Sequence, residues 1–326
     1  MSRRTALVAG GGGFIGGHLV SNLIEDGYAV RAVDIKPMQE WYQLHASANN
    51  QVADLSLYSE CCSAVEGVDL IFNLAADMGG MGFIENNKAL CMLSVLINSH
   101  LLKAVRDIDL TLQSYFFSSS ACVYNAGKQQ RPDVTALREA DAYPAEPEDG
   151  YGWEKLFSER MVRHFREDFG IPGRIARYHN VYGPLGTWDG GREKAPAAIC
   201  RKVAQASLSG KKTIEIWGDG EQTRSFMFID DCVKGSRLLA ESTVTEPLNL
   251  GSTELVTINK LVSLVEDIAG LSLGRSYNTS APQGVRGRNS DNTRLRDALG
   301  WEPSITLQEG LEQTYAWIYD QVKRAA

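Results

Sequence analysis

The chain has 326 residues, which is long for one ordinary domain and short for three, so two domains are expected. Its formal net charge of -7 at pH 7 argues against the basic surface of a nucleic-acid-binding protein. No apolar run reaches the ~20 residues of a membrane span, and the N-terminus lacks the pattern of a signal peptide. The six cysteines form no CxxC pair, so no metal site is expected. We therefore expect a cytoplasmic protein with no membrane or nucleic-acid partner.

The first half of the chain alternates short apolar segments with helical patterns. Strands are expected at residues 6–9, 29–33, 70–74 and 114–117, and helices at about 14–26, 56–65 and 86–106. Continuous apolar strands separated by helices are typical of a parallel sheet that is covered on both faces. The sequence therefore predicts an α/β fold with a Rossmann-type, doubly wound parallel sheet.

The regular alternation stops after residue 124. Residues 125–150 carry three prolines and several acids, so we expect a long loop there. A helix is expected from Tyr151 to Phe169, ending at Gly170, and a strand at 174–178 that rejoins the sheet.

Beyond that strand the elements are shorter and mixed. A Gly/Pro-rich loop is expected at 182–196 and a helix at 197–208. We predict a first domain over residues 1–181, to which residues at about 225–252 return. A smaller, mixed α/β substrate domain is predicted over residues 182–326.

A glycine-rich turn follows the first expected strand and precedes an apolar helical segment. Gly10, Gly13 and Gly16 form a GxxGxxG pattern. Missing Cβ atoms let a backbone approach a pyrophosphate closely, and a helix N-terminus offers unpaired N–H groups. A glycine motif alone is a weak signal, but its strand–turn–helix context predicts a dinucleotide site at Gly10, Gly13, Phe14, Ile15 and Gly16.

An acidic residue at the end of the second strand strengthens this prediction. Asp34 lies about 20 residues beyond the turn, where a carboxylate accepts hydrogen bonds from ribose hydroxyls and repels a 2′-phosphate. This position favours NAD over NADP, although Lys36 nearby could tolerate the phosphate. Asp54, after the third strand, could contact the adenine or only cap the helix that follows.

Tyr151 and Lys155 lie four residues apart, which places them on one face of a helix. A phenol of pKa about 10 is a poor base near neutrality, but a nearby ammonium and an oxidised nicotinamide both favour its phenolate. Ser118–Ser120 end a parallel strand upstream. We interpret Tyr151 and Lys155 as catalytic and cofactor-binding residues, with Ser120 holding a substrate oxygen beside the tyrosine.

These residues together resemble the extended short-chain dehydrogenase/reductase family, whose members act largely on nucleotide sugars. Residues 177–184 and 224–231 resemble two further signatures of the family, so the likeness covers almost the whole chain. Within the family, residues 75–83, 186–196 and 284–292 are similar to members that act on GDP-mannose.

The resemblance implies that the chain is an isomerase that uses NAD as its cofactor. Its implied reaction is epimerisation of GDP-mannose at C3 and C5 to GDP-L-galactose, with GDP-L-gulose formed by inversion at C5 alone. The resemblance also implies a homodimer through the helices at 86–106 and 151–169.

Cys122 and Lys194 are candidates for the acid and the base. Cys122 lies two residues after Ser120, so strand geometry would direct both side chains to the same side. Its simplest interpretation is a small buried residue, and that of Lys194 is a solvated charge. The members that this chain resembles in residues 75–83, 186–196 and 284–292 use a Cys and a Lys at these matching positions. The resemblance therefore implies catalytic roles, without settling which residue is the base.

Two other reactions are weighed against this one. A 4,6-dehydratase of the family resembles Thr-Asp-Glu where this chain has Ser120-Ala121-Cys122, and a simple 4-epimerase needs no extra base. A non-catalytic NAD-binding regulator commonly loses the Tyr or the Lys, and both are present here.

A GDP moiety needs cationic and amide partners, because Arg pairs bidentately with phosphate and Asn offers N–H donors. Surface ion pairing is the simpler interpretation for each such cation. Gly80 could let backbone amides approach the sugar or form only a tight turn. The predicted substrate-binding residues are Gly80, Ser120, Cys122, Asn180, Lys194, Lys202, Arg224 and Arg286, with Arg288 as the alternative to Arg286.

Overall fold

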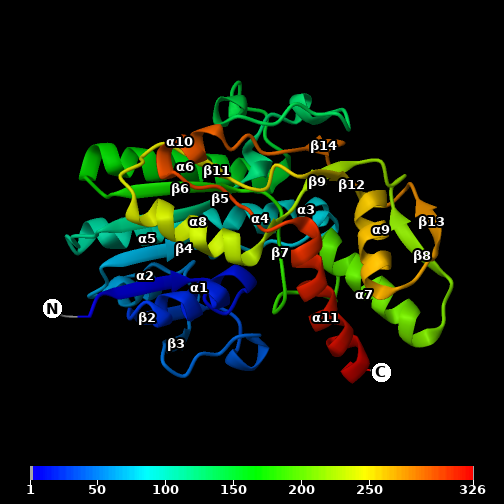
Figure 1. The fold of residues 1–326 in the computed structure, drawn as a ribbon. Coiled ribbons are helices and arrows are strands. Elements are labelled where there is room, and N and C mark those ends of the chain that lie inside the picture. Colours follow the sequence, from blue (N-terminus) through cyan, green and yellow to red (C-terminus); the bar gives the residue numbers. More distant parts are fainter. Residues whose placement is uncertain (1–2, 326) are drawn as a thin grey trace.

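The computed structural model describes residues 3–325, in which seven strands form one parallel sheet (Figure 1). The strand order is β11-β6-β5-β4-β1-β2-β3, so the direction of winding reverses between β1 and β4. The strands are β1 (Thr5–Ala9), β2 (Ala29–Asp34), β3 (Asn49–Val52), β4 (Leu70–Asn73), β5 (Ser114–Ser120), β6 (Gly173–Tyr178) and β11 (Leu248–Leu250). This order confirms the predicted Rossmann-type fold, in which ligands bind beyond the carboxyl ends of the strands.

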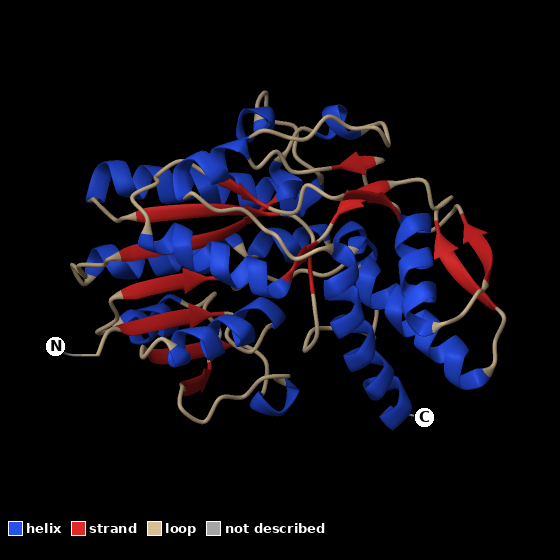
Figure 2. Cartoon of the chain, viewed as in Figure 1, coloured by secondary structure: helices blue, strands red, loops and turns tan. Residues whose placement is uncertain are grey.

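Helices cover both faces of the sheet, as Figure 2 shows. Alternate residues of β1 point to opposite faces, so Ala6 and Val8 join one hydrophobic core while Leu7 and Ala9 join another. The helices next to the sheet are α1 (Phe14–Glu25) and α8 (Ile229–Glu241) in the first core, and α2 (Tyr58–Val65), α5 (Val95–Asp107) and α6 (Asp149–Phe169) in the second. Burial on both sides explains the uninterrupted apolar sequence of the central strands.

The single helix expected at 86–106 is instead three helices. They are α3 (Met81–Asn86), α4 (Lys88–Leu93) and α5. At Asn87 the backbone leaves helical geometry, and its side-chain amide donates to the carbonyl of Phe83 in the last turn of α3. Asn side chains compete for backbone hydrogen bonds in this way, which explains the break.

The segment Lys88–Asp107 is apolar and long enough to pass for a membrane span by length and composition, contrary to the expectation from the sequence. Leu101 and Leu102 of this segment lie in the second core. Leu90 and Leu93 are exposed large hydrophobics on α4. The segment is therefore apolar on both its buried and its exposed sides, and scattered polar residues hid that from a search for an unbroken apolar run.

The loop expected at 125–150 contains short 3₁₀ helices and packs against the rest of the chain. The 3₁₀ helices within this segment are η3 (Ala126–Gln129) and η4 (Glu139–Ala142). Two others precede it, η1 (Met38–Glu40) and η2 (Ala121–Val123). Gln129 is completely buried, and Leu137 lies in a small core with Tyr124. This segment is thus packed against the chain that follows β5 and is not a free surface loop.

The part of the chain after β6 places several helices and three small sheets beside the parallel sheet (Figure 1). Its elements are β7 (Val181–Tyr182), α7 (Ala195–Ser209), β8 (Thr213–Trp217), β9 (Thr223–Ser225), β10 (Met227–Phe228), β12 (Leu255–Thr257), α9 (Ile258–Ala269), β13 (Gly274–Asn278), β14 (Gly287–Arg288), α10 (Thr293–Leu299) and α11 (Leu307–Ala325). Within this part, α8 packs in the first core and β11 is an edge strand of the parallel sheet. The division into domains near residue 181 stays a prediction.

A buried polar network joins the carboxyl ends of β5, β6 and β11. Arg177 pairs with Glu159 at 2.7 Å, and the Ser119 hydroxyl donates to the same carboxylate. His179 lies with its Nε2 atom 3.1 Å from Oδ1 of Asn249. Burial lowers the pKa of His179 to about 3, so the imidazole is neutral in the folded chain.

Candidate active site

The glycine turn after β1 makes a backbone cradle that no larger residue could form. Gly10 has a positive φ of 86°, and a Cβ atom on Gly16 would lie 2.0 Å from the carbonyl oxygen of Gly10. Gly13 is the N-cap of α1, and among residues 3–325 no side chain caps that helix. The N–H groups of its first turn are therefore available to an anion, as the predicted pyrophosphate site requires.

Asp34 and Lys36 flank this cradle at the end of β2. Oδ1 of Asp34 accepts the backbone N–H of Lys36 at 3.0 Å. The ammonium of Lys36 donates to the carbonyl of Gly12 at 2.7 Å, so it holds the glycine turn. The carboxylate at the strand end and the cradle together fit a dinucleotide whose ribose hydroxyls are free.

Asp54 occupies a turn before α2. Its Oδ1 accepts the backbone N–H of Ser56 at 2.9 Å, whereas the N-cap position of α2 belongs to Leu57. The alternative that Asp54 caps this helix is therefore wrong, because the helix begins too late for its side chain. Its contact with adenine stays a prediction.

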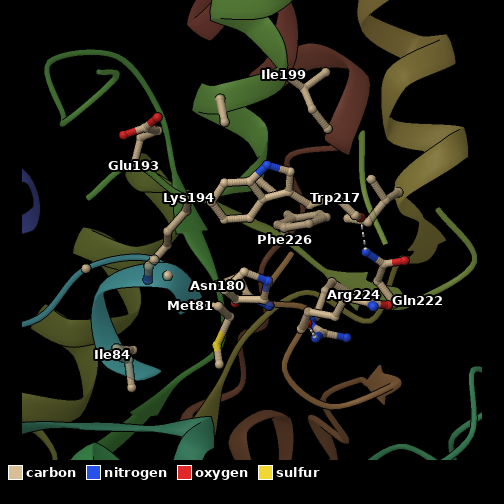
Figure 3. Close-up of a pocket in the computed structure, with 18 of the residues that line it drawn as sticks. Met81, Ile84, Asn180, Glu193, Lys194, Ile199, Trp217, Gln222, Arg224 and Phe226 are labelled. Carbon is tan, nitrogen blue, oxygen red and sulfur yellow. Dashed lines mark hydrogen bonds between the residues drawn. The ribbon is translucent and has the colours of Figure 1, made fainter. Parts of the chain in front are cut away.

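A cavity of about 280 Å³ lies at the carboxyl ends of β5 and β6 (Figure 3). It is lined by Ser120 from β5, Cys122 from η2, Tyr151 from α6 and Lys194 from the start of α7. Four of the five predicted catalytic residues thus line one cavity, although they come from four separate elements. Lys155, the fifth, lies one helical turn beyond Tyr151.

Tyr151 and Lys155 are both buried, with exposed fractions of 5% and 2%. The ammonium of Lys155 lies 5.7 Å from the centroid of the Tyr151 ring and 3.6 Å from the carboxylate of Glu154. Burial raises the pKa of Tyr151 well above its usual value, and the Ser120 hydroxyl opposes that rise. A fixed cation at this distance also favours the phenolate, so the residues present are those that a tyrosine base needs.

Cys122 reaches the cavity by a different route from the one expected. The strand ends at Ser120, and Cys122 lies in η2, so the two do not share a strand face. Instead the backbone N–H of Cys122 donates to Oγ of Ser120 at 3.2 Å, because Ser120 caps the turn. Burial raises the pKa of the Cys122 thiol.

Lys194 is the N-cap of α7, and Figure 3 shows its side chain extending toward α3 beside Met81 and Ile84. Burial lowers the pKa of Lys194. Burial therefore shifts the thiol and the amine in opposite directions, each toward its neutral form. Both groups are thereby suited to exchange protons rather than to remain permanently charged.

A clamp holds the loop that carries Lys194 against the segment before α3. The N–H of Gly80 donates to the carbonyl of Arg192 at 3.0 Å, and Arg192 pairs with Asp77 at 2.6 Å. A Cβ atom on Gly80 would lie 2.5 Å from the carbonyl oxygen of Glu193. The Gly80 amide is thus already used and the glycine permits close chain packing, but Gly80 also lines the cavity. Its contact with the sugar stays a prediction.

The predicted phosphate-binding cations divide into two groups. Lys202 and Arg224 line the cavity together with Asn180, which Figure 3 shows beside Arg224. Lys202 donates to the carbonyl of Glu215 at 2.7 Å, and burial lowers the pKa of Arg224 to about 10.

Arg286 and Arg288 have different surroundings, although they lie two residues apart. Both η nitrogens of Arg286 donate to the exposed carboxylate of Asp219, and this arginine does not line the cavity. Arg288 is 4% exposed and lines the cavity beside Cys122. Of the two alternatives, the structure therefore brings Arg288 to the site.

Sequence reasoning missed several residues of the cavity wall. Figure 3 shows Trp217, Gln222 and Phe226 at the end of the cavity that also holds Arg224. The side-chain amide of Gln222 donates to the carbonyl of Trp217 at 2.9 Å. The Trp-Gly-Asp-Gly turn was a usable signal for Trp217, whereas nothing in the local sequence marks Gln222 or Phe226. In residues 3–325 no group of three or more His, Cys, Asp or Glu could hold a metal ion.

Comparisons with known proteins agree with this geometry. Residues 6–251 match the NAD dependent epimerase/dehydratase family. The chain is 45% identical over 318 residues to GDP-mannose 3,5-epimerase of Arabidopsis thaliana, covering 97% of this chain and 82% of the relative. It is 44% identical to GDP-mannose 3,5-epimerase 1 of Oryza sativa subsp. japonica, with the same coverage.

Solved structures are similar over almost the whole chain. The UDP-glucose 4-epimerase of Thermotoga maritima, with UDP-glucose, has a TM-score of 0.87 at 26% identity and covers 98% of this chain and 99% of that one. The UDP-glucuronic acid 4-epimerase of Bacillus cereus, in complex with UDP-glucuronic acid and NAD, has a TM-score of 0.82 at 26% identity, covering 97% and 99%.

Proposed function

The chain belongs to the NAD dependent epimerase/dehydratase family, and on that premise we propose that it inverts C3 and C5 of GDP-mannose through a transient ketone at C4. The product is GDP-L-galactose, with GDP-L-gulose from inversion at C5 alone. The observation that carries the proposal is that Cys122 and Lys194 line the same cavity as Tyr151 and Ser120. The names of the relatives from Arabidopsis thaliana and Oryza sativa support the choice of sugar.

NAD fits the glycine cradle and the carboxylate beside it. The pyrophosphate would lie on the first turn of α1, the ribose hydroxyls on Asp34, and the nicotinamide half near Tyr151 and Lys155. The residues that would hold it are Gly10, Gly13, Phe14, Ile15, Gly16, Asp34, Asp54, Tyr151 and Lys155. When bound, NAD takes a hydride from C4 of the sugar and later returns it.

Tyr151 removes the proton from the hydroxyl at C4, while Ser120 holds that oxygen in place. The fixed ammonium of Lys155 favours the phenolate form of the tyrosine. The resulting ketone makes the hydrogens on C3 and C5 acidic, because each lies next to the carbonyl. Redox chemistry at C4 therefore prepares a proton exchange at its two neighbours.

Inversion of a carbon needs a base on one face of the ring and an acid on the other. Cys122 approaches from the end of β5 and Lys194 from the start of α7, so the cavity has a proton-exchanging group on two of its walls. Burial raises the pKa of the thiol and lowers that of the amine, which prepares each to give up or accept a proton. Lys202, Arg224 and Arg288 line the same cavity and supply cations for the GDP diphosphate, with Asn180 as an amide partner.

Deuterium exchange tests the proposal. The protein is incubated with GDP-mannose in D2O, and the sugar is analysed by NMR. Deuterium at both C3 and C5 is expected, and its absence from both positions would reject the proposed reaction. In the same assay Cys122→Ala and Lys194→Ala should each stop inversion. At each carbon, the variant that still exchanges deuterium has kept its base, so the residue removed in the other variant is the base.

A 4-epimerase of another nucleotide sugar is the second candidate, favoured by the similarity to the UDP-glucose 4-epimerase structure. It needs no proton exchange at carbon, so Cys122→Ala would leave its turnover intact. A substrate panel with UDP-glucose, UDP-glucuronic acid and GDP-mannose separates the two. A 4,6-dehydratase would reveal itself in the same panel by releasing water and leaving a 4-keto-6-deoxy sugar.

We also propose a homodimer through α4, α5 and α6 as the functional form. Supporting this, large apolar side chains are exposed on these helices, among them Leu93 and Leu96 of the first two and Trp153 and Phe157 of α6. Light scattering should give twice the monomer mass, and Phe157→Glu should shift it toward the monomer. All six cysteines are free thiols, which supports a cytoplasmic location. The net charge of -7 supports the proposal that no nucleic acid is a partner.

A further inference from the structure

The guanidinium of Arg288 lies against the thiol of Cys122 in a buried setting. Nη1 of Arg288 lies 3.5 Å from the sulfur of Cys122. Its other two nitrogens are fixed by short hydrogen bonds, with Nε donating to Oε1 of Gln129 and Nη2 to Oε2 of Glu148, both at 2.7 Å. The planar guanidinium is thus held in one orientation, with one edge directed at the sulfur.

Glu148 is tied to the same cysteine through the backbone. Its N–H donates to the carbonyl of Cys122 at 3.0 Å, and its side chain is 8% exposed. Burial acts to raise the pKa of Glu148, but Arg288 outweighs burial and lowers it, so the carboxylate is charged. Cys122 therefore has one fixed positive charge beside its sulfur, and the fixed negative charge that pairs with this cation also acts on the thiol.

We propose that Arg288, held by Glu148 and Gln129, is a positioning residue that favours the thiolate form of Cys122. This inference rests on the proposed function, in which Cys122 exchanges protons with the sugar. A neighbouring Arg stabilises a thiolate by direct attraction and by donating a hydrogen bond to it. Whether Cys122 removes the proton or returns it, easier access to its charged form speeds the exchange.

Several other groups near Cys122 also affect the pKa of its thiol. Tyr151 from α6, Lys194 from the start of α7 and Arg224 from β9 also interact with Cys122 electrostatically. Cys91 from α4 packs in the same apolar cluster. Arg288 is the cation that donates a hydrogen bond to the sulfur, and its attraction opposes the rise in the pKa of Cys122 that burial causes. Glu148 acts in the opposite direction on that pKa.

Opposite charges provide a signature that a purely structural ion pair would not give. Removing the charge of Arg288 should raise the pKa of Cys122, whereas removing that of Glu148 should lower it. A pair that only braces the fold would instead produce similar loosening in both variants. The sign of the change therefore separates the two roles.

The experiment measures how fast iodoacetamide alkylates Cys122 in the full chain as a function of pH, with peptide mass spectrometry to isolate this cysteine from the others. In Arg288→Met the apparent pKa should rise by roughly 1 to 2 units, which slows alkylation near neutral pH roughly 10- to 100-fold. In Glu148→Gln the pKa should fall by up to about 1 unit, which accelerates alkylation severalfold. Arg288→Lys keeps the positive charge but lacks the planar guanidinium that bonds Gln129, Glu148 and Cys122 together. The pKa of Cys122 in this variant should lie between those in wild type and in Arg288→Met.

Arg286→Met is the matched control, because it removes an arginine two residues away that pairs with Asp219 instead. Its alkylation profile should equal that of wild type. An unchanged profile in Arg288→Met, or shifts of the same sign in both variants, would overturn the proposal. If circular dichroism shows that Arg288→Met does not fold, Glu148→Gln alone tests the proposal. Slower or unchanged alkylation of Cys122 in Glu148→Gln would then reject it. The alkylation experiment contains no substrate and is therefore independent of the proposed reaction. If the thiol pKa shifts as expected but no deuterium enters GDP-mannose, only the proposed function is rejected.

Discussion

The two ends of the site are built by different means. At the cofactor end, one continuous stretch of backbone, residues 10–16, makes the binding surface, and glycines are required because added Cβ atoms would collide with the chain itself. At the substrate end, the surface consists of buried side chains such as Ser120, Cys122 and Lys194, which come from separate elements. The first end is fixed by local sterics, and the second by tertiary packing and by charges that compensate one another.

This difference predicts how each end responds to substitution. Backbone surfaces should be sensitive to added bulk and insensitive to the chemistry of nearby side chains. Side-chain surfaces should be sensitive to the loss of a single polar atom or charge. Four variants or conditions test this contrast, from the largest expected effect to the smallest.

Tyr151→Phe tests the substrate end by removing one hydroxyl. Turnover should fall roughly 10³-fold, because a positioned acid/base group contributes about that much. Bound NAD should be retained, as measured by the cofactor released on denaturation. Tyr115→Phe removes another buried hydroxyl, outside the cavity, and should keep turnover. Unaltered activity in Tyr151→Phe would remove the tyrosine from the mechanism.

Gly16→Ala tests the cofactor end by adding one methyl group. That methyl would lie 2.0 Å from the carbonyl oxygen of Gly10, so the turn must shift and destabilise the fold by about 1 to 3 kcal/mol. The purified protein should carry little NAD. Gly17→Ala is the control, since its methyl would meet mainly the side chain of Gln43, which can move. Equal NAD content in the two variants would contradict the steric account.

Acid tests the polar network beneath the substrate end. Burial lowers the pKa of His179 to about 3, whereas an unfolded chain binds this proton below about 6.5. The stabilisation from neutral His179 is therefore complete above about pH 6.5 and is lost as the pH falls toward 3. Between pH 7 and pH 5 the free energy of unfolding should drop by about 2 kcal/mol from this residue.

Urea unfolding at both pH values measures that loss, and His179→Gln provides the comparison. Glutamine can still donate to Oδ1 of Asn249 but takes up no proton. The variant should show a drop between the two pH values that is smaller by about 2 kcal/mol. An identical pH dependence in the two proteins would show that His179 does not titrate in this range.

Lys36→Met should have the smallest effect. It removes the hydrogen bond to the carbonyl of Gly12 but leaves the backbone cradle intact. Affinity for NAD, measured by calorimetry, should weaken by about 1 kcal/mol or less, which is under about tenfold in Kd. Complete loss of NAD binding would show that side chains, and not the backbone alone, determine the cofactor end.

The same contrast explains what the sequence could predict. The parallel sheet, the glycine turn and Asp34 were predictable because each is recorded in a local pattern of apolar, glycine or acidic residues. Tyr151 and Lys155 were predictable because one helical turn separates them. Their burial, and the route by which Lys194 reaches them, were not.

Tertiary contacts decided the remaining cases. Arg286 and Arg288 look equivalent in the sequence, but Asp219 pairs with the first and Glu148 with the second. Gly80 resembles a sugar-binding glycine, yet its amide is used by Arg192. Cys122 was placed in the cavity for the wrong reason, because a 3₁₀ turn replaced the expected strand.

The clamp of Arg192 on Asp77 has a consequence for the timing of catalysis. Arg192 also stacks over the Phe83 ring at 3.8 Å, so the loop that ends at Lys194 lifts either by breaking these contacts or by moving together with Asp77 and α3. A half-converted sugar would have to wait for that opening before escaping into solvent. Slow escape leaves time for the hydride to return to C4. Few turnovers would then release a 4-keto sugar and leave the cofactor reduced.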